Sequence, residues 1–113
     1  ASRLHNGQQL AEQVRVDESL VSYMLAIVEA TRESEALSLG VSPRGAQALF
    51  RAVQALALLE GRDYVLPDDV KRLAVPVFAH RVVLNQRVSL SARSTETAER
   101  LLTEIVNRTE VPL

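Results

Sequence analysis

Residues 42–61 read SPRGAQALFRAVQALALLEG and carry both boundary signals of a long helix. Ser42 is a favourable N-cap, Pro43 suits the first helical position, and Gly61 stands just past the expected end. Between these signals the apolar residues recur at helical spacing, which predicts a buried stripe on a central helix. The stripe consists of Ala46, Leu49, Phe50, Val53, Leu56, Ala57 and Leu59.

The same helix carries one polar strip. Its residues follow one another at intervals of three or four positions, so their side chains project from one face. Leu58 lies on this strip, and an exposed leucine there would mark a protein interface. The strip consists of Arg44, Gln47, Arg51 and Gln54.

Three further segments show the pattern of amphipathic helices. The first covers about residues 18–32, with Asp17 as its N-cap and Tyr23 beside its apolar stripe. The second begins at Pro67 and is bent near its end by Pro76. The third covers about residues 95–108 and is capped by Ser94. The first stripe is Leu20, Met24, Ile27, Val28 and Thr31, the second is Val70, Leu73, Ala74, Val77 and Phe78, and the third is Ala98, Leu101, Leu102, Ile105 and Val106.

These patterns predict a mostly α fold. We expect a small helical bundle of about four main helices, plus a short N-terminal helix over residues 7–14 that Asn6 caps. Only residues 64–66 and 82–84 have β character, so at most one short β-hairpin should join them as a minor two-stranded element. In the core we expect Leu49, Val53 and Leu56 to pack against Leu20, Met24, Ile27 and the Leu101/Ile105 stripe.

The composition is that of one globular domain. The 113 residues are 47% hydrophobic and 24% charged, with a net charge of −1, which excludes a largely disordered chain. The chain has no cysteine, so disulfide frameworks and thiolate metal sites drop out. Its apolar run at residues 55–59 is far too short to span a membrane. We therefore expect a cytoplasmic protein without a membrane partner, and the balanced charge argues against a nucleic-acid partner.

Catalytic constellations are largely missing from the sequence. His5 and His80 are far apart and lack metal-ligand spacing, and no GxxxxGK[ST] phosphate loop is present. Asp68 and Asp69 suit the positive end of a helix, which explains them without a cation site. His80 and Arg81 likewise suit a helix C-terminus, and a functional role for them stays open.

Arg44 has a position that folding alone does not favour. A cation in the first turn of a helix is electrostatically disfavoured, whereas phosphate and carboxylate groups bind well at such a terminus. Ser42, Pro43 and Arg44 therefore look like an anion-facing helix start. The alternative that this pattern leaves open is a plain surface arginine.

Several short motifs, taken in order, resemble a known family. They are ATR at 30–32, LGVSPRGA at 39–46, ALALLEGRDYV at 55–65, PDDV at 67–70 and HR at 80–81. Together and at these intervals they resemble the C-terminal lid domain of MoxR-type AAA+ ATPases. The resemblance covers about residues 14–113 and leaves residues 1–13 as a linker with a short helix.

The resemblance implies a role in ATP hydrolysis. In that family a P-loop domain binds ATP with Mg²⁺, a helical lid closes over the nucleotide, and the subunits form a ring. Gly40, Ser42, Pro43 and Arg44 match the sensor 2 segment, which implies that Arg44, with Ser42 and Pro43 beside it, faces the ATP phosphates. The implied partners are the P-loop domain of the same polypeptide, neighbouring ring subunits and proteins with von Willebrand factor A domains. The implied outcome is chaperone-like remodelling or maturation of protein complexes.

Two departures from the family pattern are visible. This chain has no P-loop domain, so we expect no catalytic residue, no metal site and no tightly bound cofactor within it. Leu66 stands where such lids carry Thr or Ser, so the cap of the following helix must be weaker or come from another residue. The alternative functions are a free-standing helical domain that binds a partner protein and a small helical DNA-binding domain, which the balanced charge disfavours.

Overall fold

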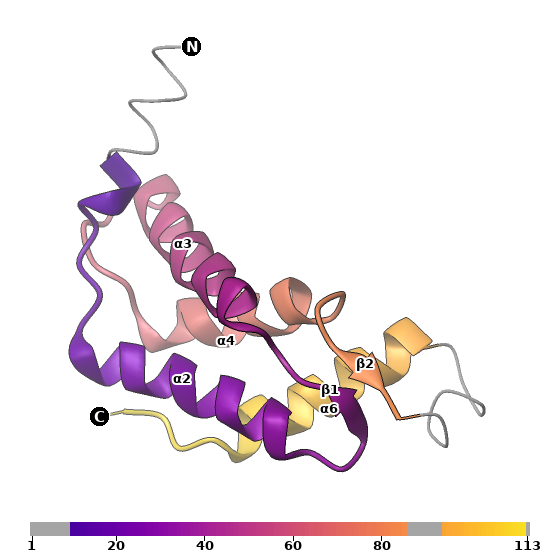
Figure 1. Ribbon diagram of the computed structural model, residues 1–113. Coiled ribbons are helices and arrows are strands. Elements are labelled where there is room, and N and C mark those ends of the chain that lie inside the picture. Colours follow the sequence, from indigo (N-terminus) through magenta and orange to yellow (C-terminus); the bar gives the residue numbers. More distant parts are fainter. Residues whose placement is uncertain (1–9, 86–93, 113) are drawn as a thin grey trace.

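A computed structural model describes residues 10–85 and 94–112 (Figure 1). Within them the main elements are the helices α2 (Glu18–Glu33), α3 (Pro43–Leu59), α4 (Pro67–Phe78) and α6 (Ser94–Arg108), and the strands β1 (Leu37–Leu39) and β2 (Val83–Leu84). Residues 10–12 are helical too, which agrees with part of the short N-terminal helix, while its predicted Asn6 cap lies outside the described residues. The mostly α prediction is confirmed.

The helices start and stop where their local signals lie. The Asp17 carboxylate accepts a hydrogen bond from the Ser19 N–H at 3.0 Å and caps α2. Ser42 caps α3, and Gly61 beyond its end has a φ of +77°, a conformation that favours glycine. The last helix begins at Ser94, one residue earlier than predicted, and the predicted cap depends on the Ser94 side chain, which lies outside the described residues.

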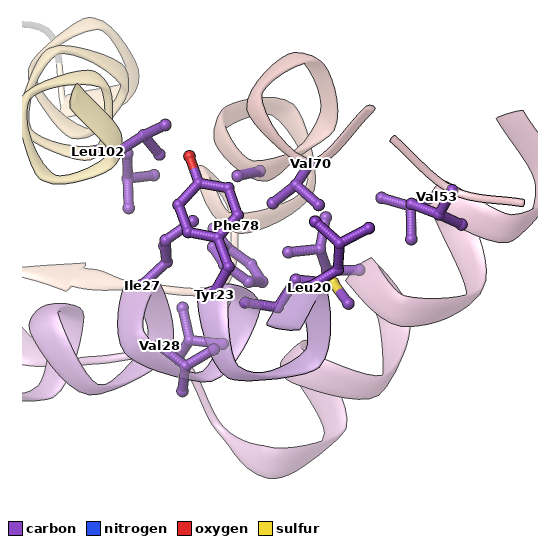
Figure 2. Packing of buried hydrophobic residues seen from close by; sticks show 14 of the residues in the cluster. Leu20, Tyr23, Ile27, Val28, Val53, Val70, Phe78 and Leu102 are labelled. Atoms are coloured by element: carbon purple, nitrogen blue, oxygen red, sulfur yellow. The ribbon is translucent and has the colours of Figure 1, made fainter. Parts of the chain in front are cut away.

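The core lies between the four helices. α3 packs against α4 and α2, and α6 packs against the same two helices. Leu49 and Val53 of α3 are fully buried, as are Ile27 of α2 and Phe78 of α4. Figure 2 shows side chains of α2, α4 and α6 meeting in this core, with Leu102 as a contribution of α6.

Several core predictions are wrong in detail. Leu56 is half-buried, Leu59 is 84% exposed, and Leu58 packs partly against the core. The buried arc of α3 follows Gly45, Leu49, Val53 and Ala57 at intervals of four, and Leu56 and Leu59 lie near or beyond one edge of it. On the other helices, Tyr23 is buried in the α2 stripe, and Leu102 instead of Leu101 is the buried leucine of α6.

Gln54, a member of the polar strip of α3, is also buried. The extended segment before α2 crosses this edge of α3, and the Gln54 amide donates a 2.9 Å hydrogen bond to the Val14 carbonyl. The same segment pairs in parallel with the chain between α3 and α4. The Arg15 N–H donates to the Asp63 carbonyl at 2.8 Å, and the Val65 N–H donates to the Arg15 carbonyl at 2.9 Å.

This pairing corrects the predicted β-hairpin. Residues 64–66 do not pair with residues 82–84, because the backbone around Tyr64 is already bonded to Arg15. β2 instead pairs with β1 in an antiparallel ribbon that carries a bulge, with Leu37 opposite Leu84 and Leu39 opposite Val83. The two strands lie beside each other where β1 leads into α3 (Figure 1).

The start of α4 is capped from inside the helix. The Asp69 carboxylate accepts a hydrogen bond from the Leu66 N–H at 2.8 Å, which is the half of a capping box that needs no polar side chain at position 66. The same carboxylate, only 1% exposed, accepts two hydrogen bonds of 2.9 Å from the Arg62 guanidinium. Asp69 therefore has a structural role, since its carboxylate bonds both to the Leu66 N–H and to the Arg62 guanidinium.

Because of the buried ion pair between Arg62 and Asp69, we expect the fold to lose stability in acid. Burial alone would raise the pKa of Asp69, but the hydrogen bonds from Arg62 and Leu66 and the nearby arginine charges outweigh it, so the pKa falls below its ordinary 3.8. Since the folded state holds this proton more weakly than the unfolded state, the ion pair stabilises the fold above about pH 4 and is lost as pH falls further. Thermal unfolding between pH 6 and pH 2.5 should show this decline. Asp69→Asn should lower stability at pH 6 and flatten the acid decline, and an unchanged decline would contradict the prediction.

Candidate functional site

The first turn of α3 presents Arg44 to solvent. Ser42, Pro43 and Arg44 are all exposed, whereas Val41 and Gly45 on either side are buried. In the described part of the chain the cations that form ion pairs are Arg62 and Arg72, and Arg44 takes part in none of these pairs. Arg44 is thus accessible, and no carboxylate of the described residues is paired with it. Its role at a nucleotide stays a prediction.

The helix terminus offers little backbone for an anion. Pro43 has no N–H, and the Gly45 N–H donates to the Ser42 hydroxyl at 3.2 Å. The Ala46 N–H already bonds to the Ser42 carbonyl at 3.0 Å. Of the first three helical residues, only Arg44 keeps an N–H without a bonding partner in the described chain. An anion at this terminus would therefore be held mainly by the Arg44 guanidinium, a planar bidentate donor.

A second arginine lies at the same terminus. The Arg81 side chain runs across Gly45, with its Cδ 3.2 Å from where a Cβ on that glycine would stand. The same Cβ would lie 2.8 Å from the Val41 side chain. A residue larger than glycine at position 45 would therefore push against both Val41 and Arg81. The sequence placed His80 and Arg81 at the end of α4, and the structure brings the Arg81 stem to the start of α3. Sequence spacing alone gave no sign of this contact between residues 36 positions apart.

The chain before α3 is tightly packed. A Cβ on Gly40 would lie 2.8 Å from the backbone of Thr31 and Arg32 at the end of α2. Only glycine allows the two backbones to come this close. The segment that leads to Ser42 and Arg44 is thus held against α2, so the candidate site rests on rigid elements.

Comparison with known proteins agrees with this architecture. The AAA lid domain family matches residues 29–105. The uncharacterised protein YeaC of Bacillus subtilis is 41% identical over 106 residues, which make up 94% of this chain and 32% of YeaC. The chaperone MoxR1 of Mycobacterium tuberculosis is 38% identical over 86 residues, which make up 68% of this chain and 23% of MoxR1. The protein MoxR of Paracoccus denitrificans is 59% identical over 46 residues, which are 41% of this chain and 14% of that protein.

A solved structure matches the fold as well. A candidate ATPase from Cytophaga hutchinsonii superposes with a TM-score of 0.83 at 30% identity, over 93% of this chain and 34% of that protein. The fold is that of a helical AAA lid, and the chain belongs to the AAA lid domain family. Within that family it is a lid domain of the MoxR-type AAA+ ATPases. The chain spans about a third or less of the length of these relatives.

None of the helices described here combines the length and the apolar character needed to cross a membrane.

Proposed function

We propose that this chain closes over ATP held by the P-loop domain of a longer ATPase and brings Arg44 to the β- and γ-phosphates. ATP and Mg²⁺ bind to that domain, and the lid moves when the γ-phosphate is lost. A guanidinium beside the phosphates stabilises the charge of phosphoryl transfer. Ser42 caps the helix that carries Arg44, and together with Pro43 it lines the nucleotide-facing surface.

The observation that carries this proposal is the exposed guanidinium of Arg44 in the first turn of α3, which pairs with no carboxylate of residues 10–85 and 94–112. A cation in this position carries a small electrostatic penalty for the fold. A bound phosphate group would replace this penalty with a favourable interaction, because it is attracted both to the guanidinium and to the positive helix terminus. The lid fold and the MoxR-type relatives support ATP as the source of this phosphate.

The proposal extends to the assembly. The longer ATPase forms a ring in the cytoplasm, in which this lid contacts its own P-loop domain and the neighbouring subunits. Each hydrolysis step moves the lid and so remodels or matures a client complex. Proteins with von Willebrand factor A domains are the proposed partners in selecting that client.

The chain alone should not hydrolyse ATP. The sequence has no GxxxxGK[ST] phosphate loop, and the described residues include no group of three or more potential metal ligands, so we expect the chain not to position Mg²⁺ or the attacking water. We expect its affinity for ATP to be no tighter than about 1 mM, since one arginine and one helix terminus supply few contacts. Phosphate release and calorimetric titration test both statements.

The matched experiment uses the longer protein with and without this lid. We expect ATP turnover by the whole protein and a large loss when the lid is removed. Turnover by the isolated chain that survives further purification and scales with its concentration would contradict the proposal. So would full turnover in the protein that lacks the lid.

A further inference from the structure

The residue that leads into the α3 cap is bonded through its backbone to the end of α2. The Val41 N–H donates to the Thr31 hydroxyl at 3.0 Å, and the Val41 carbonyl accepts from the Arg32 Nε at 3.0 Å. Two consecutive residues of α2 thus hold both polar backbone groups of Val41. We call these two hydrogen bonds the Val41 clamp.

Thr31 is an unusual helix residue. Its side chain is fully buried, and its hydroxyl also donates to the Val28 carbonyl at 2.6 Å. The hydroxyl therefore uses its one proton inside α2 and offers a lone pair to the Val41 N–H. Valine would fill the same volume but would leave that buried N–H without a partner, which is costly in a dry core.

Close packing limits how the clamped segment can move. Val41 is fully buried, and the backbone at Gly40 lies so near Thr31 and Arg32 that a Cβ would stand 2.8 Å from them. Only Ser42 and Pro43 separate Val41 from Arg44, and their conformations are fixed by the cap and by the proline ring. A shift at Val41 is therefore passed on to the backbone of Arg44 at the start of α3.

We propose that Thr31 is a positioning residue for Arg44, with Arg32 as the second half of the Val41 clamp. This inference rests on the proposed function of Arg44. The end of α2 and the start of α3 move as one body when the lid closes, so the guanidinium reaches the phosphates in a fixed orientation. A displacement near 1 Å at a catalytic contact can lower a rate by about 10²-fold.

The test measures ATP turnover in the longer protein, below its unfolding temperature. Thr31→Val should lower kcat by roughly tenfold to a hundredfold with a smaller change in KM, because the lost contact matters most in the transition state. Thr31→Ser keeps the hydroxyl and should restore most of kcat. Thr103→Val is the matched control, because the Thr103 hydroxyl makes a similar 2.7 Å bond to the Glu99 carbonyl on the exposed side of α6.

A double variant separates positioning from simple stability. If Thr31 acts through Arg44, then Thr31→Val combined with Arg44→Ala should be no slower than Arg44→Ala alone. Additive losses would overturn the inference, as would a normal kcat in folded Thr31→Val. Should Thr31→Val not fold, Arg32→Lys takes its place, because it keeps the charge and removes the Nε donor. Combined with Arg44→Ala, Arg32→Lys should then be no slower than Arg44→Ala alone. If Arg44→Ala itself has normal turnover, the proposed function fails and this inference falls with it.

Discussion

Arg44→Ala should lower the ATP turnover of the longer ATPase by about tenfold to several hundredfold. This range corresponds to a loss of about 1.4–4 kcal/mol of transition-state stabilisation, somewhat less than the effect of an arginine finger. The reason is that Arg44 is exposed and unpaired in the described chain and has the bidentate geometry that phosphate oxygens favour. Steady-state phosphate release at saturating ATP measures the effect.

Two variants control for charge and for folding. Arg51→Ala removes another exposed arginine two turns along the same face of α3 and should leave turnover nearly unchanged. Arg44→Lys keeps the charge but loses the planar fork, so it should recover only part of the rate. Thermal unfolding of this chain with Arg44→Ala should stay within about 0.5 kcal/mol of the parent. A large loss of stability would make Arg44 a structural residue instead.

Leu49→Ala should destabilise this chain by about 2–5 kcal/mol through the cavity it leaves. Leu49 is fully buried on the face of α3 that packs against α4 and α2. Denaturant unfolding of the 113-residue chain measures the loss. Leu59→Ala on the same helix is the matched control, because Leu59 is 84% exposed and should change the stability by less than about 0.5 kcal/mol. A loss below about 0.5 kcal/mol for Leu49→Ala would mean that a different face of α3 is buried.

Helix boundaries and most buried stripes could be predicted because their signals are local. Ser42, Pro43 and Gly61 act on backbone within one turn, and periodic apolar residues define a face wherever the partner helix lies. The exposed position of Arg44 agrees with the anion-facing helix start that the sequence indicated. The order and spacing of the short motifs indicated the protein family, which composition and periodicity alone do not reveal.

Contacts between distant parts of the chain could not be predicted in this way. β2 had two candidate partners, residues 37–39 and residues 64–66. It pairs with residues 37–39, because the backbone of Arg15 already bonds to Asp63 and Val65. Gln54 is buried because that same segment crosses its edge of α3. The periodicity of α3 includes no information about either neighbour.

The contacts that hold the candidate site in place are also contacts between distant parts of the chain. Thr31 counted as one more member of an apolar stripe, although its hydroxyl bonds to Val41 ten residues away. Arg81 matched the preference of cations for helix C-termini, whereas its stem packs across Gly45. In each case a satisfactory local explanation concealed a long-range contact.

The most direct measurement is a structure of the longer ATPase with a non-hydrolysable ATP analogue and Mg²⁺. We expect the lid to close over the nucleotide, with an Arg44 guanidinium nitrogen about 3 Å from a β- or γ-phosphate oxygen. A closed lid with bound nucleotide in which Arg44 points to solvent, or pairs with a carboxylate, would contradict the account.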